Sequence, residues 1–196
     1  MRFAHGLKEQ NIVCETIGRG LQTVLARKGG IEDFELAGEG IVDAAGAEAI
    51  PVRTQPFLLL PTRFHEGEMP VRDTLREQLR DDLPRKFEGQ FQARYGAELI
   101  AVHRIEEASK LDAVVPLQAF TSAELHKRFE YRQPGLFLLV VRAVKLRDEV
   151  FVPETDETSG CRSWVSLPQP HACEAVPVLS DEAFEAAREA IQHAVA

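Results

Sequence analysis

Several features are scarce in this sequence, and each absence excludes a class of protein. Only three of the 196 residues are cysteine, at uneven spacings, which is too few for a disulfide scaffold. The longest apolar run, residues 136–141, is far shorter than the ~20 residues that a membrane-spanning helix needs. The first residues lack the apolar core of an export signal. We therefore expect a cytoplasmic protein without a membrane segment.

Basic residues are also scarce relative to acidic ones. Lysine and arginine number 23 against 31 aspartate and glutamate residues, for a formal net charge of -8. Broad binders of nucleic acid or anionic membranes carry an excess of basic charge, because phosphate neutralisation supplies their affinity. The sequence disfavours broad polyanion binding but leaves room for a local basic pocket that takes one phosphate group or one strand end.

The composition that remains is that of an ordinary globular domain. Hydrophobic residues make up 44% and charged residues 28% of the chain, close to the averages for folded proteins. A chain of this length can bury a single core, and it has neither an internal repeat nor a linker long enough to divide it. We expect one domain over residues 1–196.

Hydrophobic patterning predicts a mixture of strands and helices. Apolar runs bounded by turn residues predict strands at 21–26, 56–61, 97–105, 113–118 and 136–146, with extended segments at 150–153 and 164–167. A short helix is expected at 122–129. Residues 7–17 allow either a short helix ended by Gly18 or the first strand of a hairpin. We favour the helix, because the polar residues at 8–11 do not alternate with apolar ones.

A long amphipathic helix is predicted at about 70–83. Apolar residues recur there at every fourth position between Pro70 and Pro84, which suit the start and the stop. Arginines at 72, 76 and 80 invite a phosphate-binding interpretation, but acids at 73, 77 and 81 form the neighbouring row. Opposite charges at this spacing indicate a self-paired exposed face.

The last helix begins near Ser180. Serine is a good N-cap, and Leu179 and Phe184 stand at the positions of a hydrophobic staple. With the strands above, the fold class is α+β: a single domain with a mixed central β-sheet, the helix at 70–83 and a C-terminal helix.

Five short stretches follow one another in a recognisable order: Gly6–Glu9, Leu25–Ile31, Phe57–Thr62 with His65, Gly160–Val165, and Pro177–Asp181 with Phe184. Together they resemble the bacterial DUF1802 family, a domain of unknown function, over about residues 5–190. The resemblance implies one domain and brings no established activity. It also implies that residues 37–55 are a loop insertion, since the family pattern passes more directly from residue 34 to residue 57.

The segment formed by Arg27, Lys28, Gly29 and Gly30 is the first candidate anion site. Glycine permits close backbone approach and the turn conformations of anion-binding nests, and two cations add fixed positive charge. The spacing of a Walker loop is absent. The alternative is a tight turn with a solvated basic rim.

A second candidate directly follows the strand at 56–61. Arg63 is suited to clamp an anion there, and His65 to act as a general base or to orient a phosphate. The alternative is a loop histidine near the next helix. One histidine beside Glu66, with no second ligand at a recognised spacing, does not make a metal site.

Arg142 is the third candidate, because it lies inside an apolar strand. A buried guanidinium needs a partner. It either pairs with an internal acid for structural reasons, which we favour, or projects into a pocket.

Two weaker patterns complete the set. Acids at 9, 15, 32, 33 and 35 bracket a lysine-bearing strand as in metal-dependent nucleases, but the required Glu-x-Lys spacing is missing. Cys161, His171 and Cys173 lack the spacing of a zinc site. We expect Cys161 and Trp164 to be packing residues.

Three functional hypotheses remain. The first is a protein that binds or hydrolyses a small phosphorylated or nucleotide-like ligand. In that hypothesis His65 is the candidate catalytic residue, and the ligand-binding residues are Arg27, Lys28, Gly29, Gly30, Arg63, His65 and Arg142. The second is a non-enzymatic interaction module or a subunit of a larger assembly, and the third a metal-dependent nuclease-like enzyme. The sequence identifies no cofactor and no metal, and the first hypothesis depends on whether the loops at 27–30 and 63–65 share one cleft.

Overall fold

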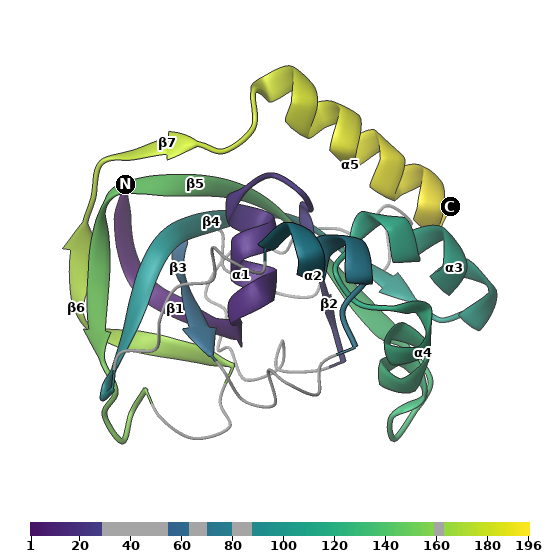
Figure 1. The fold of residues 1–196 in the computed structure, drawn as a ribbon, viewed down its shortest axis with the longest axis horizontal. Helices are drawn as coiled ribbons and strands as arrows, with labels where there is room; N and C mark the ends of the chain where they lie inside the picture. Colours follow the sequence, from purple (N-terminus) through teal and green to yellow (C-terminus); the bar gives the residue numbers. More distant parts are fainter. Residues whose placement is uncertain (29–54, 63–69, 80–87, 159–162) are drawn as a thin grey trace.

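The computed structural model describes residues 1–28, 55–62, 70–79, 88–158 and 163–196 (Figure 1). They form a single α+β domain with a seven-stranded mixed sheet and a C-terminal helix. The strands are β1 (Arg2–Gln10), β2 (Val24–Arg27), β3 (Phe57–Thr62), β4 (Gln90–Ile105), β5 (Leu136–Pro153), β6 (Trp164–Ala172) and β7 (Ala175–Pro177). The helices are α1 (Asn11–Gly18), α2 (Asp73–Leu79), α3 (Leu111–Val114), α4 (Ser122–Glu130) and α5 (Asp181–Val195), with 3-10 turns η2 (Ala108–Lys110) and η3 (Val115–Leu117).

The sheet has the strand order β2-β5-β4-β3-β1-β6, and β7 pairs with the part of β5 that β2 leaves uncovered. β1 and β3 run parallel, and the other pairs are antiparallel. The long strands β4 and β5 curve strongly (Figure 1). As a result Arg27 at the end of β2 reaches Glu9 at the end of β1, although three strands separate β2 from β1 in the sheet order.

The segment before Gly18 corrects the sequence prediction. Residues 2–10 form β1, and only residues 11–18 are helical. β1 lies between β3 and β6, so pairing on both sides determines its conformation despite its polar residues. Those residues have partners: the Lys8 ammonium donates to Thr158 O at 2.9 Å, and Glu9 pairs with Arg27.

The strand predicted at 113–118 is also wrong. Residues 111–117 form α3 and η3. Leu111 and Val114 are buried while residues 112 and 113 are exposed, which is a helical period rather than an alternating one. The paired valines at 114 and 115 suggest a strand only when the exposed positions beside them are ignored.

Other predicted elements are present. Strands cover 57–60, 97–105 and 164–167, and the two segments at 136–146 and 150–153 are one strand, β5. Within the described residues, the helix predicted at 70–83 is α2, and residues 80–83 lie outside them, as do residues 37–54 of the predicted insertion. The Ser180 hydroxyl accepts a hydrogen bond from Ala183 N at 3.2 Å, so it is the N-cap of α5 as expected.

The core has two large parts, on the two faces of the sheet. One contains Leu7, Ile17 and Leu59 and is covered by helices, and the other contains Phe3 and Leu58. Every residue of α1 is buried, including the charged Glu15. None of the helices in the described part of the chain is long and apolar enough to cross a membrane.

The burial of α1 predicts different reactivities for the two described cysteines. Cys14 is 2% exposed, and burial, together with the nearby Glu9 and Glu15 carboxylates, raises its pKa well above the ordinary value. Burial raises the pKa of Cys173 too, but that residue is partly exposed. We expect iodoacetamide to label Cys173 in the native protein and Cys14 only after denaturation, as read by peptide mass mapping. Equal labelling of Cys14 and Cys173 in the native protein would contradict the burial of α1.

Candidate functional site

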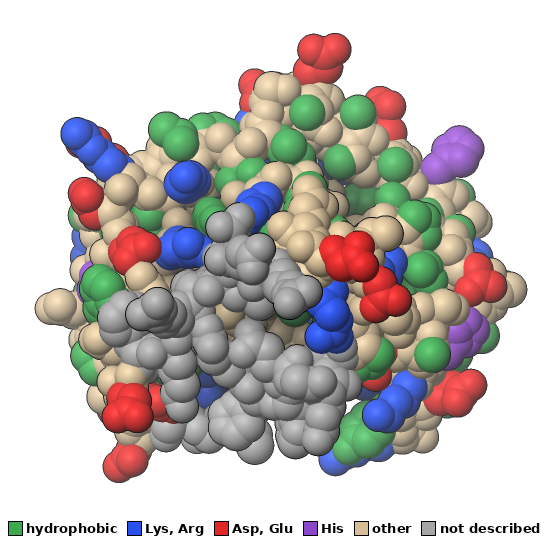
Figure 2. Space-filling view, viewed as in Figure 1, with side chains coloured by type: hydrophobic (Ala, Val, Ile, Leu, Met, Phe, Trp, Pro, Cys, Tyr) green, Lys and Arg blue, Asp and Glu red, His purple; other side chains and the backbone are tan. Residues whose placement is uncertain are grey.

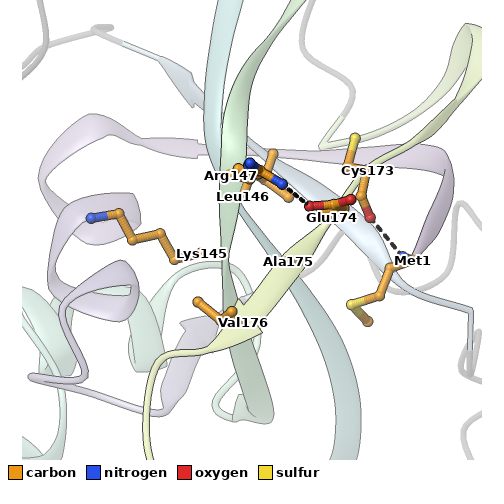
Figure 3. A pocket seen from close by; sticks show the side chains of 8 residues that line it. All are labelled: Met1, Lys145, Leu146, Arg147, Cys173, Glu174, Ala175 and Val176. Atoms are coloured by element: carbon orange, nitrogen blue, oxygen red, sulfur yellow. Dashed lines mark hydrogen bonds and ion pairs between the residues drawn. The ribbon is translucent and has the colours of Figure 1, made fainter.

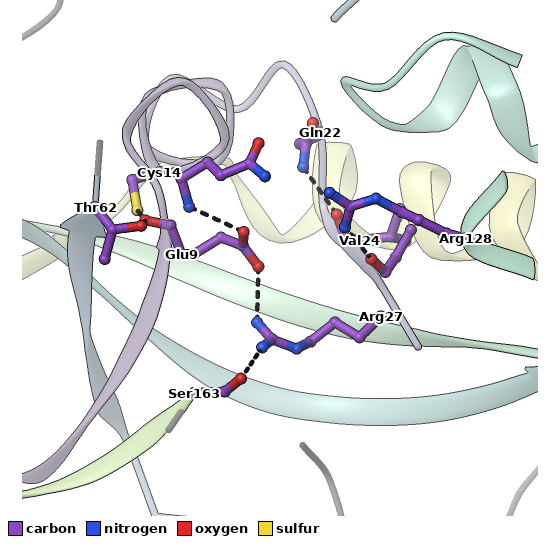
Figure 4. Close-up of polar contacts among 10 residues, drawn as sticks. Glu9, Cys14, Gln22, Val24, Arg27, Thr62, Arg128 and Ser163 are labelled. Carbon is purple, nitrogen blue, oxygen red and sulfur yellow. Dashed lines mark hydrogen bonds and ion pairs between the residues drawn. The ribbon is translucent and has the colours of Figure 1, made fainter. Parts of the chain in front are cut away.

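Four residues fasten the strand ends together: Glu9, Arg27, Thr62 and Ser163, which we call the strand-end cluster (Figure 4). Arg27 Nη1 donates to Glu9 Oε2 at 2.7 Å, and Arg27 Nη2 donates to the Ser163 hydroxyl. The Thr62 hydroxyl donates to Glu9 O at 3.1 Å. The ion pair is nearly buried, with side chains 11% and 10% exposed. Glu9 therefore neutralises the Arg27 charge, and the cluster closes the curved sheet.

Lys28 is held by main-chain carbonyls in the last turn of α4 and just after it. Its ammonium donates to Phe129 O and Gly135 O, both at 2.8 Å, and to Gln133 O. An ammonium has three donors, and three carbonyls take them here. Burial, and then the nearby Arg104, lowers the pKa of Lys28. The side chain is thus engaged within the protein.

Arg142 is paired with an acid, as favoured from the sequence, but the partner is exposed rather than internal. Its guanidinium pairs with the Asp181 carboxylate in the first turn of α5 and lies 5.4 Å from the centre of the Phe184 ring. The contacts attach α5 to β5.

The remaining predicted site residues, Gly29, Gly30, Arg63 and His65, lie outside the described residues, as does Cys161. Thr62, which precedes Arg63, shares Glu9 as a partner with Arg27. Whether the two basic loops share one cleft stays a prediction, as does a ligand-binding role for any of the seven residues named from the sequence.

A pocket that the sequence did not indicate lies on another part of the surface. Its cavity of about 480 Å³ is lined by Gly18, Arg19, Arg94, Tyr95, Lys145, Val176, Pro177 and Val178. We call it the cationic pocket, because three of its lining residues carry positive charge. Arg19 comes from the end of α1, Arg94 from β4 and Lys145 from β5. Figure 2 shows Lys and Arg side chains gathered over these elements, left of centre.

Glu15 of α1 organises the cationic pocket. Its side chain is 2% exposed and forms an ion pair with Arg94 Nη2. Its Oε2 atom lies 3.6 Å from Arg19 Nε and accepts a hydrogen bond of 3.3 Å from the Tyr95 hydroxyl. One buried carboxylate thereby fixes two guanidiniums and a phenol.

Local backbone features make this arrangement possible. The β4–β5 pairing shifts between Ala93 and Tyr95, and such an irregularity lets Arg94 and Tyr95 both reach Glu15, where regular alternation would send them to opposite faces. At Gly18, a Cβ atom would lie 2.3 Å from the Tyr95 ring, so glycine allows the ring to pack under the end of α1.

The pocket has donors to offer an anion. The Arg94 side chain lines the cavity and is 26% exposed, so part of it is open to a ligand. Lys145 is exposed and forms no ion pair with any other residue that the structure describes. Burial, and then the Glu15 carboxylate, raises the pKa of Tyr95, so its phenol stays protonated at neutral pH. Three formal positive charges against Glu15 leave the site with an excess of two.

Sequence reasoning missed this pocket because its cations stand far apart in the chain and only the β4–β5 register unites them. Tyr95 pairs with Lys145 across the two strands. One signal was available: Glu15 interrupts an otherwise apolar segment, Ile12–Ile17, and a buried acid needs cations around it.

Comparisons with known proteins confirm the resemblance seen in the sequence. The family model described as "Domain of unknown function (DUF1802)" matches residues 6–190. No curated protein matches the chain in sequence.

Crystal structures of ASCH from Zymomonas mobilis are similar to this chain at 10% or 11% identity. One has a TM-score of 0.43 and covers 92% of this chain and 90% of its own. A single-residue variant of that protein gives 0.41 at 11% identity, with 94% of this chain and 96% of its own covered. This likeness concerns the fold alone.

Proposed function

The chain belongs to the DUF1802 family, a domain of unknown function, and we propose from its own geometry that it binds a small phosphate-bearing ligand in the cationic pocket. One observation carries this proposal. In a chain with a formal net charge of -8, three cations from three separate elements line one open cavity, and a single buried carboxylate contacts two of them. Like charges repel, so their gathering is costly unless an anion completes it.

The residual charge of the pocket suits a phosphate group. A phosphate monoester carries about −1.5 to −2 at neutral pH and offers three acceptor oxygens. Two guanidiniums and an ammonium supply charge-assisted donors for those oxygens, and the Glu15 contacts hold Arg94 in place before a ligand arrives. A preorganised donor loses less conformational entropy on binding.

The proposal keeps the ligand class of the first sequence hypothesis and changes its location. Arg27, Lys28 and Arg142 have intramolecular partners, whereas Lys145 is exposed and forms no ion pair with another described residue. The charged groups that line the cationic pocket are hydrogen-bond donors for an anion. We therefore propose that the protein binds the ligand, and we assign no hydrolysis to this pocket.

The test is a Lys145→Ala variant. Lys145 is exposed, so its removal leaves the fold intact while it takes away one charged hydrogen bond. We expect pyrophosphate to bind about tenfold more weakly than to the wild type, by isothermal titration calorimetry at low salt. Rising ionic strength is expected to weaken pyrophosphate binding to the wild type and to reduce the difference in affinity between the wild type and Lys145→Ala.

Lys127→Ala is the matched control. Lys127 is an exposed lysine of α4, outside the lining of the cationic pocket, and its loss changes the net charge by the same amount. It is expected to leave pyrophosphate affinity unchanged. A wild-type protein without saturable binding, or equal losses in the two variants, would overturn the proposal.

A further inference from the structure

A second and larger hollow adjoins the cationic pocket. Its cavity of about 740 Å³ is lined by Met1, Lys145, Leu146, Arg147, Cys173, Glu174, Ala175 and Val176 (Figure 3). Lys145 and Val176 line both cavities. In Figure 3 the Lys145 side chain extends to the left toward α1, while Arg147 and Glu174 lie to its right. The two hollows therefore meet at Lys145 and Val176.

Strand register explains the arrangement. Tyr95, Lys145 and Val176 are direct partners across β4, β5 and β7, so they form one row on one face of the sheet. Arg147 N donates to Glu174 O at 2.9 Å, which places these two residues in the next row on the same face. Rows two residues apart along a strand are about 7 Å apart. A ligand that reaches from one row to the next thus spans both hollows.

The two hollows differ in chemistry. The cationic pocket offers donors for a phosphate, whereas on the same face the second hollow offers the carbon surface of Val176 beside an ion pair. Val176 is 61% exposed, so its side chain is open to a ligand. The Arg147 guanidinium pairs with the Glu174 carboxylate and presents a flat, polarisable surface that rings stack on. The free acceptor capacity of the carboxylate can take an amino N–H of a base.

From this juxtaposition we infer that the two hollows form one groove for a nucleoside monophosphate, with the phosphate at Lys145 and the base against Val176 and Arg147. The sugar of such a ligand separates the base from the phosphate by about the spacing of the two rows. A flat heteroaromatic ring uses both the carbon surface and the guanidinium, whereas an alkyl chain would use only the carbon surface. The inference rests on the proposed function, since it requires a phosphate in the cationic pocket.

A series of ligands distinguishes phosphate binding in the cationic pocket from nucleotide binding in the whole groove. Inorganic phosphate, ribose 5-phosphate, adenosine 5′-phosphate and adenosine are titrated into the wild type and into Arg147→Ala. We expect the nucleotide to bind more tightly than ribose 5-phosphate to the wild type. In the variant this preference is expected to fall by about two- to fivefold, the size of an exposed cation–π contact. Lys145→Ala is expected to weaken all three phosphates by the same factor.

Arg188→Ala is the matched control, because Arg188 of α5 also forms an exposed ion pair, with Glu185. It is expected to leave every affinity unchanged. Equal binding of the nucleotide and ribose 5-phosphate to the wild type, or a preference that survives in Arg147→Ala, overturns the groove while phosphate binding still supports the cationic pocket. Absence of binding by every phosphate overturns both.

Discussion

Replacing Glu15 by glutamine is expected to lower the free energy of unfolding by about 3 kcal/mol. The substitution keeps the shape of the side chain but removes the negative charge that contacts both Arg94 and Arg19. Breaking a buried ion pair from one side costs about 3–5 kcal/mol, because the remaining charge is left uncompensated. The lower end of that range applies, since the two arginine side chains are 26% and 30% exposed.

Urea denaturation measures this loss, and Glu185→Gln is the control. Glu185 also pairs with an arginine, Arg188, but its side chain is 51% exposed and lies on the outside of α5. Exposed pairs contribute about 0–1 kcal/mol, so the control is expected to change stability by less than about 0.5 kcal/mol. A similarly small loss in Glu15→Gln would show that Glu15 does not organise the cationic pocket.

Gly18→Ala is expected to destabilise the protein by about 2 kcal/mol although alanine favours helices. At the end of α1 the helix propensity alone would give a gain of up to about 1 kcal/mol. The new Cβ atom, however, would lie 2.3–2.4 Å from three carbons of the Tyr95 ring. That ring is buried and anchored through its hydroxyl to Glu15, so it cannot simply turn aside. Overpacking of this kind costs about 1–3 kcal/mol and outweighs the gain.

A double-mutant cycle with Tyr95→Leu identifies the cause. In the Tyr95→Leu background the clashing ring is absent, so Gly18→Ala is expected to be neutral or stabilising. A penalty of the same size in both backgrounds would attribute the loss to the backbone at residue 18. Because the ring lines the cationic pocket, Gly18→Ala is also expected to weaken pyrophosphate binding.

The parts of the fold that sequence could predict are those that local signals determine. The Ser180 cap and the apolar stripe of the last helix act within one element, and α5 begins where they place it. The prolines around 57–60 and the apolar run from 136 mark strands that bury both faces in the sheet. In each case burial and local propensity favour the same structure.

The parts that could not be predicted depend on distant partners. Residues 2–10 become a strand because β3 and β6 supply pairing on both sides, and Glu9 can be there because Arg27 neutralises it. The cationic pocket depends on the β4–β5 register, which places Tyr95 opposite Lys145. A pattern read along one segment contains neither the register nor the curvature of the sheet.

The position of β1 also sets the order in which the chain can fold. β1 is synthesised long before β6, which is one of its neighbours, and the Met1 ammonium donates to Cys173 O, 172 positions along the chain. Contacts of such separation slow folding, because a long loop must close before they form. Until β6 emerges from the ribosome, β1 presents an open edge to other nascent chains. Efficient folding of this protein therefore depends on keeping that edge apart from other strands until β6 has been synthesised.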